Sequence, residues 1–286
     1  MLHTLPAIAM AVLLATASLP TLAAESYDNC KGFIDAVPAT ITTPGTWCLR
    51  KDLSTAMTFG AAITVATNNV TLDCNDFKIG GLAAGVGTGA YAIHANSRLN
   101  ATVRHCNIRG FWRGLVFSGN GAGHVVEDNR FDGNTYNGLY VIGDGSVVRR
   151  NQVTDTGGST AALGSAYGII TYLAVDVLDN TVSGVSPTAD QTGDADAYGI
   201  YTESNPNGSI SGNRVRGLVG AGGVAFGICN ISNGRISLDG NHVVGPGLWG
   251  LVCSGSSSAS AKDNIISGFT TPIGNCTDSG GNAVIP

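Results

Sequence analysis

The sequence predicts an all-β protein built as a single right-handed parallel β-helix, a solenoid of about 8–9 coils with an N-terminal disulfide-bonded cap. Three observations predict this fold. The chain repeats every 22 or 23 residues where its connections are tightest, an Asn stands at a fixed place in each repeat, and each repeat contains three short apolar segments. A period of this length is typical of solenoids, whose units bury their apolar faces against their neighbours.

The recurring Asn lies between two apolar residues. In VVEDNRFDGN, residues 125–134, Asn129 has Val126 three positions before it and Phe131 two positions after it. The same place is taken by Asn151, Asn180, Asn213, Asn241 and Asn264, and by Cys106 in TVRHCNIRG. Asn tolerates left-handed backbone angles, and its amide can bond the matching Asn of the next coil, about 4.8 Å away. We therefore expect a ladder of Asn side chains at one corner.

Three apolar rows accompany the Asn row. Three positions before it stand Val103, Val126, Val148, Val177, Ile210, Leu238 and Ala261. Two positions after it stand Ile108, Phe131, Val153, Val182, Val215, Val243 and Ile266. A third row, preceded by a small residue, comprises Ile93, Leu115, Leu139, Ile169, Ile200, Ile228 and Leu251. The β-branched, Gly-rich pattern lacks helical spacing and the six-residue rhythm of a left-handed β-helix, which favours three strands per right-handed coil.

The predicted organisation is a signal peptide at 1–24, a cap segment at 25–59 and the β-helix at 60–286. The apolar run from Leu5 to Leu19, followed by small residues at Ala23 and Ala24, is shorter than the roughly 20 residues that cross a bilayer, so export is favoured over a membrane span. A net charge of -5 without a Lys/Arg run gives no basic surface for nucleic acid. We expect a secreted or periplasmic monomer with no membrane span after cleavage.

The Gly-Ile strands, Asn corners and V-x-x-N-x-V rows resemble the right-handed parallel β-helix repeats of the pectin-lyase-like superfamily, over roughly residues 60 to 285. This resemblance implies a substrate cleft walled by one corner and by the strand that follows it. It does not imply one chemistry, because the fold hosts lyases, hydrolases, epimerases, adhesins and binding proteins.

Seven Cys residues in the mature chain indicate an oxidising compartment. Cys30 and Cys48 bracket the cap segment and are expected to pair. Two inner pairs are expected from their matching places in neighbouring coils, Cys74 with Cys106 and Cys253 with Cys276, which leaves Cys229 alone. Stacked apolar thiols are the alternative for the inner pairs.

Long insertions at 155–166, 184–197 and 217–225 fall at the same corner of adjacent coils, where binding residues are often carried. The strand beside them carries two rows. The first, Tyr91, Tyr167, Tyr198, Phe226 and Trp249, is expected to pack into the core or a corner. The second, His94, Tyr140 and Tyr201, is expected to face outward and, with Glu203, to bind substrate.

Catalytic and metal candidates lie at the same edge. Asp190, Asp194 and Asp196 could hold Ca²⁺ or supply a carboxylate pair for glycoside hydrolysis, although a solvated acidic loop is the simpler interpretation. Arg113 is the only basic residue placed on the candidate strand, where it could act as the base of a uronate lyase. The family's N-x-D, Asp-Asp, Gly-His-Gly and Asp-Pro-His patterns are missing from the sequence.

Two functions follow. The first is a secreted β-helix protein that binds an extracellular carbohydrate chain, a polysaccharide or cell-surface glycan, with polysaccharide lyase or glycoside hydrolase activity left open. The alternative is a non-catalytic structural, adhesion or envelope-associated solenoid.

Overall fold

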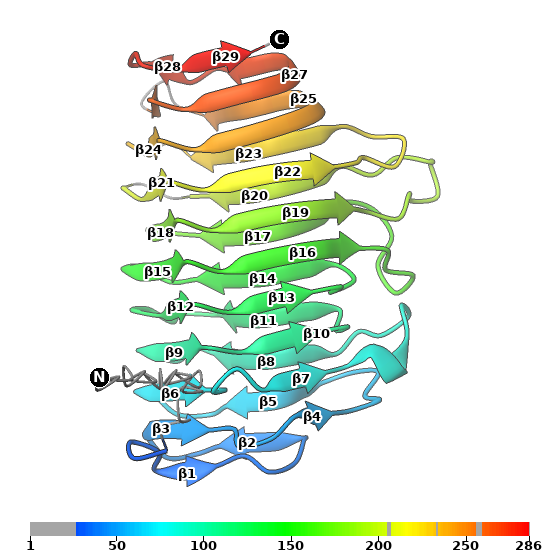
Figure 1. Ribbon diagram of the computed structural model, residues 1–286, viewed down its shortest axis with the longest axis vertical. Helices are drawn as coiled ribbons and strands as arrows, with labels where there is room; N and C mark the ends of the chain where they lie inside the picture. Colours follow the sequence, from blue (N-terminus) through cyan, green and yellow to red (C-terminus); the bar gives the residue numbers. More distant parts are fainter. Residues whose placement is uncertain (1–26, 205–206, 233, 256–258, 286) are drawn as a thin grey trace, which may run out of the picture.

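The computed structural model describes residues 27–204, 207–232, 234–255 and 259–285. The predicted signal peptide at 1–24 lies outside these residues. The described chain winds into a right-handed parallel β-solenoid of about nine turns, stacked along the long axis of the molecule (Figure 1). Within the described residues there is no α-helix, and one 3-10 turn, η1 (Leu82–Ala84), is present. The predicted fold class is confirmed.

Each turn contributes one strand to each of three parallel ladders. The first ladder contains β1 (Gly32–Phe33), β3 (Gly45–Cys48), β6 (Val70–Asp73), β9 (Ala101–Arg104), β12 (Val125–Glu127), β15 (Ser146–Arg149), β18 (Val175–Leu178), β21 (Ser209–Ser211), β24 (Ser237–Asp239), β26 (Ser260–Lys262) and β28 (Thr277–Asp278). The second contains β4 (Leu53–Ser54), β7 (Lys78–Gly80), β10 (Asn107–Arg109), β13 (Arg130–Asp132), β16 (Gln152–Gly157), β19 (Thr181–Ser186), β22 (Arg214–Leu218), the starts of β25 (His242–Gly255) and β27 (Ile265–Gly274), and β29 (Ala283–Ile285). The third contains β2 (Ala39–Ile41), β5 (Ala61–Val65), β8 (Tyr91–Asn96), β11 (Arg113–Ser118), β14 (Asn137–Ile142), β17 (Ala166–Tyr172), β20 (Ala197–Glu203), β23 (Ala225–Ser232) and the ends of β25 and β27.

The three apolar rows of the sequence are the core. Val126 pairs in register with Val103 and Val148 on the first ladder, and Phe131 pairs with Val153 on the second. On the third ladder, Ile169 pairs with Ile200. These seven residues are all fully buried, because stacking places each apolar side chain between its counterparts in the neighbouring coils. The repeat alignment is therefore confirmed residue by residue.

The Asn ladder is also present. Asn151 Nδ2 donates to Asn180 Oδ1 at 3.0 Å, and Asn180 Nδ2 donates to Asn213 Oδ1 at 3.0 Å. The same bond links successive Asn side chains from Asn129 to Asn282. The left-handed angle, however, belongs to the residue before each Asn, with φ of 55° at Asp128 and 67° at Gly212. At this corner the residue before the Asn turns the chain, and the Asn side chain forms the hydrogen bonds between neighbouring coils.

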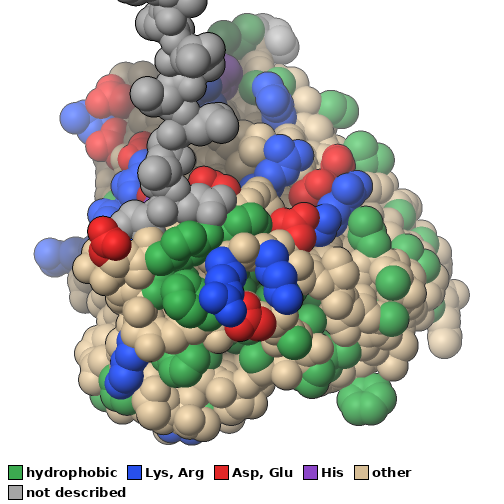
Figure 2. Space-filling view, turned by 60° about the horizontal axis from the view of Figure 1, so that its bottom comes forward, with side chains coloured by type: hydrophobic (Ala, Val, Ile, Leu, Met, Phe, Trp, Pro, Cys, Tyr) green, Lys and Arg blue, Asp and Glu red, His purple; other side chains and the backbone are tan. Residues whose placement is uncertain are grey.

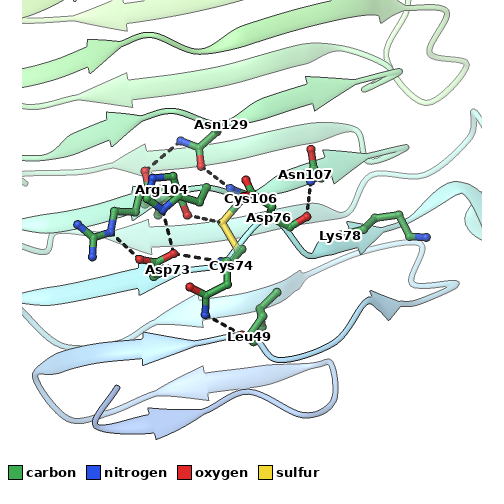
Figure 3. Close-up of a disulfide and its surroundings, with 12 residues drawn as sticks. Leu49, Asp73, Cys74, Asp76, Lys78, Arg104, Cys106, Asn107 and Asn129 are labelled. Carbon is green, nitrogen blue, oxygen red and sulfur yellow. Dashed lines mark hydrogen bonds and ion pairs between the residues drawn. A yellow bond between two sulfur atoms is a disulfide. The ribbon is translucent and has the colours of Figure 1, made fainter. Parts of the chain in front are cut away.

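Three disulfides form as predicted: Cys30–Cys48, Cys74–Cys106 and Cys253–Cys276. Cys229 is free and buried. Figure 3 shows the Cys74–Cys106 bond at the corner where the Asn ladder begins, with Asn129 Oδ1 accepting from the Cys106 backbone N–H at 3.0 Å. The disulfide thus ties two coils at the position that an Asn pair occupies further along the chain.

The segment at 25–59 already contributes β1–β4 to the ladders, with β2 paired to β5 and β3 paired to β6. Figure 2 shows this N-terminal end, where basic and acidic side chains lie beside one another. Arg50 pairs with Asp35 at 2.8 Å, and Lys78 pairs with Asp52 at 3.0 Å. These cations are matched by neighbouring carboxylates, so they do not form a basic patch. In the described part of the chain, no helix has the length and hydropathy needed to span a membrane.

Candidate functional site

The outer face of the third ladder carries a continuous row of rings, which we call the aromatic strip. Its members, in order along the helix, are Tyr91, Trp112, Tyr136, Tyr167, Tyr198 and Phe226. Centroids of successive rings lie between 4.6 Å, for Tyr198 and Phe226, and 6.1 Å, for Tyr136 and Tyr167. Each member is half-buried, so part of each ring is exposed to solvent. The strip extends from β8 to β23.

The prediction that the first aromatic row packs into the core or a corner is wrong, and a local break in strand alternation explains why. An ideal Cβ on Gly168 would lie 2.4 Å from Val182 Cγ1, so Gly168 faces the core. The next residue, Ile169, also faces the core and is fully buried. Because two successive residues point inward, the side chain before them, Tyr167, is left on the outer face. Gly199 and Gly227 repeat this arrangement.

The second row does lie on the outer face, beside the strip. Tyr201 meets Tyr167 and Tyr198 edge-on, at 5.5 Å from each. Tyr172, in register with Glu203, bridges Tyr140 at 5.5 Å and Tyr201 at 6.4 Å. The structure therefore brings Tyr140, Tyr201 and Glu203 into one neighbourhood. His94 lies nearer the N-terminal end, 5.4 Å from Tyr91, with Nε2 3.4 Å from Ser118 Oγ.

Carboxylates bond the edges of these rings. Tyr201 donates its hydroxyl hydrogen to Glu203 Oε2 at 2.8 Å, and Tyr198 donates to Asp196 Oδ2 at 3.1 Å. Burial raises the pKa of both phenols, and the neighbouring carboxylates raise it further. Burial likewise raises the pKa of Tyr172 to about 12. The phenols are therefore neutral hydrogen-bond donors at any physiological pH.

Arg113 lies within the strip. Its guanidinium carbon is 4.4 Å from the Trp112 ring centroid and 5.2 Å from those of Tyr136 and Tyr140. In the register of the third ladder, two strands, β14 and β17, separate it from β20 and the acidic residues. The arrangement thus gives Arg113 a cation–π environment and keeps it apart from Asp194 and Asp196.

The predicted acidic residues do different work within their loop. Asp190 Oδ1 accepts from the Thr192 hydroxyl at 2.6 Å and from the Thr192 backbone N–H at 2.7 Å, and these bonds lower the pKa of Asp190. Asp196 Oδ1 accepts from the Val224 backbone N–H at 2.8 Å, so this carboxylate ties two inserted loops together. Asp194 is exposed.

Asp194 and Asp196 nevertheless approach one another. Their Oδ1 atoms each lie 2.5 Å from an ideal Cβ position on Gly223, so the two oxygens are within about 5 Å of each other. Among the described residues, no group of three or more His, Cys, Asp or Glu side chains could hold a metal ion. Calcium binding at Asp190, Asp194 and Asp196 stays a prediction, which a chelator-induced fall in melting temperature would support.

The inserted loops wall one side of the strip. The Thr160 backbone N–H donates to Val86 O at 3.1 Å, so segment 158–165, which precedes β17, contacts segment 81–90, which precedes β8. The two coils between them, those of β11 and β14, have only short connections at this corner, so the two long segments meet above them. The Ser159 backbone N–H donates to Thr135 O at 3.0 Å, which packs the second loop onto the corner that carries Tyr136. These loops lie on the right of Figure 1. A shallow depression of about 420 Å³, lined by Asp155, Gly184, Val219 and neighbours, lies at the ends of β16, β19 and β22, away from the rings.

Sequence reasoning missed Trp112, Tyr136 and Tyr172. The first aromatic row consists of residues directly before the small residue, and in these two coils that place is held by Arg113 and Asn137. Trp112 and Tyr136 stand one residue earlier, so they do not align with the row. Their rings nevertheless fill the same line. An aromatic residue at either of the two positions before the small residue would have been the sequence signal.

A family model described as "Right handed beta helix region" matches the chain over residues 55–193 and 91–270. The similar solved structures include the catalytic unit of a GH87 alpha-1,3-glucanase from Streptomyces thermodiastaticus, with 14% identity, a TM-score of 0.47, and coverage of 88% of this chain and 62% of that one. A periplasmic alginate epimerase shares 13% identity, with a TM-score of 0.44 and coverage of 84% and 75%. The Dettilon tailspike protein shares 13% identity, with a TM-score of 0.40 and coverage of 87% and 57%. At these identities the likeness concerns the fold alone. The chain spans about three fifths of the glucanase unit. No curated protein sequence matches the chain.

Proposed function

We propose that this chain, which belongs to the right-handed beta helix family, binds a carbohydrate chain lengthwise along its aromatic strip. The observation that carries this proposal is the unbroken row of half-buried rings from Tyr91 to Phe226. Most neighbouring rings stack face to face, as Tyr198 and Phe226 do with planes 4° apart, so the strip presents ring edges to solvent. A pyranose can lay its apolar face across these edges and direct its hydroxyls to polar groups beside them. The coil spacing of about 4.8 Å is comparable with the length of one sugar unit, so successive rings can each meet a successive sugar.

The polar groups beside the strip suit the same ligand. Glu203 and Asp196 each hold a phenol hydroxyl and present carboxylate oxygens next to the rings. Such oxygens accept hydrogen bonds from sugar hydroxyls. The exposed loops on one side and the rigid ladder beneath provide a walled, preformed surface.

We place this function outside the cytoplasm, in a secreted or periplasmic monomer. Three disulfides within one chain support an oxidising compartment, because cytosolic thiols are kept reduced. Binding to polysaccharide or cell-surface glycan would then occur where such chains are found.

A second candidate function is cleavage of the bound chain. The close approach of Asp194 and Asp196 favours it, because retaining glycosidases hold two carboxyl groups about 5–5.5 Å apart. Incubation with uronate and neutral polysaccharides would then release reducing ends, and Asp194→Asn would stop the release. Silence across the whole panel would leave the non-catalytic adhesion or envelope role.

Binding itself is tested with Tyr198→Ala, which removes the ring stacked between Tyr167 and Phe226. We expect about a tenfold or greater loss of affinity for the oligosaccharide that binds best, measured by calorimetry, since buried aromatic anchors dominate such contacts. Phe33→Ala, at the N-terminal end of the first ladder, is the matched control. Equal affinity of the two variants and wild type would refute the proposal.

A further inference from the structure

Four buried polar atoms without a hydrogen-bond partner gather at one place on the strip. They are Trp112 Nε1, Arg113 Nε, Thr135 Oγ1 and Asn137 Oδ1, half of all such side-chain atoms among the described residues. Asn137 is 1% exposed and Thr135 is 6% exposed. Buried polar groups are almost always hydrogen-bonded, because an unpaired group loses its bonds to water. A concentration of exceptions therefore marks a place where a partner is missing.

These residues belong to two stacked corners. The Tyr136 and Asn137 backbone N–H groups both donate to Trp112 O, at 2.9 and 3.2 Å. Arg113 and Asn137 are register partners on β11 and β14. The four atoms thus lie on adjacent coils of the strip, beneath the contact between segments 81–90 and 158–165.

The cation at this place has no counter-ion. Most basic side chains near the N-terminal end pair with a carboxylate, as Arg104 does with Asp73 at 2.7 Å. No ion pair within 4.0 Å is found for Arg113 in the part of the chain that the structure describes; its guanidinium rests on rings instead. A partly desolvated guanidinium attracts an anion, and planar oxyanions match its fork of donors.

We propose that this place, framed by Trp112, Arg113 and Asn137, is a subsite that takes one acidic sugar unit of the bound glycan, bearing a carboxylate or sulfate. The inference rests on the proposed function and adds the charge of the ligand. The oxyanion accepts from the Arg113 guanidinium and the Trp112 indole N–H, and a ring hydroxyl donates to Asn137 Oδ1. Three of the four residues whose polar atoms lack a partner in the free protein, Trp112, Arg113 and Asn137, thus gain one in the complex.

Access requires only a side-chain movement. Arg113 is partly exposed while its Nε is covered, and its long side chain lies on the rings rather than in an ion pair. Rotamer changes of this kind are common when an interface forms. As the guanidinium turns toward the oxyanion, it moves off the Trp112 ring that it now covers. Arg113 is therefore a specificity-determining residue of the strip, in place of the proton-abstracting base that its position first suggested.

The test compares three probes on the intact protein: a uronate oligosaccharide, the same oligosaccharide with its carboxylates reduced to hydroxymethyl groups, and a sulfated neutral oligosaccharide. We expect wild type to bind one of the acidic probes about ten- to hundredfold more tightly than the reduced probe, since the loss of a hydrogen bond to a charged group weakens binding by about this factor. Added salt should shrink the preference. The better acidic probe identifies the oxyanion.

Two variants and a control complete the design. Arg113→Met keeps the apolar stem on the rings but removes the charge, so the preference should fall to about onefold while the reduced probe binds as before. Asn137→Asp places a counter-ion beside Arg113 and should have the same effect. Arg216→Met removes an exposed charge from the second ladder and should leave the preference intact.

Wild type that binds the reduced probe as tightly as both acidic probes would overturn the inference and leave the proposed function standing. An undiminished preference in Arg113→Met would do the same. Failure of wild type to bind any oligosaccharide would overturn both.

Discussion

Replacement of one ladder amide, Asn180→Ala, should strongly destabilise the solenoid. The Asn180 side chain makes four hydrogen bonds. Its Oδ1 accepts from Asn151 N–H at 2.9 Å and from Asn151 Nδ2 at 3.0 Å. Its Nδ2 donates to Val148 O at 2.9 Å and to Asn213 Oδ1 at 3.0 Å. The residue is 0% exposed, so water cannot replace these partners.

The magnitude follows from those bonds. A neutral hydrogen bond contributes about 1 kcal/mol net, and buried groups left unpaired add to the loss, so the free energy of unfolding should fall by about 4 kcal/mol. In a domain of this size, each kcal/mol lowers the melting temperature by about 2–4 °C, so a fall of about 10 °C is expected. Thermal unfolding followed by circular dichroism measures it.

Two further Asn variants separate burial from bond number. Asn282 ends the ladder and also makes four side-chain hydrogen bonds, but it is only half-buried. Asn282→Ala should therefore lower the melting temperature by only a few degrees, because water can take over the lost bonds. Exposed Asn120 is the inert control, and Asn120→Ala should change nothing measurable. The reasoning fails if the melting temperature of Asn180→Ala lies within about 2 °C of that of Asn120→Ala, since such a difference corresponds to less than about 1 kcal/mol.

Three other outcomes are expected. Gly199→Ala should destabilise the third ladder by about 1–3 kcal/mol, because an ideal Cβ would lie 2.3 Å from Val215 Cγ1; an unchanged urea midpoint would contradict this. The double variant Cys74→Ala/Cys106→Ala should lose about 4 kcal/mol, since the disulfide closes a loop with a sequence separation of 32; a melting temperature equal to that of wild type would argue against the loop-entropy account. Burial lowers the pKa of His124 to about 4, below its unfolded value near 6.5, so stability that is complete above pH 6.5 should be lost as the pH falls toward 4. His124→Gln should flatten that pH profile, and a profile identical to that of wild type would assign the acid sensitivity to other groups.

Much of the fold could be predicted from the sequence because each core row repeats the same kind of side chain. Val103, Val126 and Val148 stack on one another, so an apolar residue recurs at the same place of each repeat in the sequence. The residue that turns the corner could not be predicted in this way. Asp128, Arg150 and Gly212 share a backbone angle but no chemistry, so their common role leaves no pattern of residue types.

The candidate site was harder to predict for a similar reason. Strict alternation along β17 would have placed Tyr167 on the same side as Ile169, in the core. Tyr167 lies on the outer face because two successive residues, Gly168 and Ile169, both face the core. Gly168 can face the core only because it lacks a side chain and so fits closely against Val182. Side-chain direction in such a strand is decided by packing against the neighbouring ladder, which the local sequence does not encode.

The corner amides have one more consequence. Along the ladder, each Nδ2 donates to the Oδ1 of the next Asn toward the C-terminal end, so each coil offers the same acceptor to the coil before it and the same donor to the coil after it. A duplicated turn spliced between two existing turns would find a fitting neighbour on either side. A chain of this design could lengthen or shorten by whole turns, and each added turn that carries a ring would extend the aromatic strip by one ring.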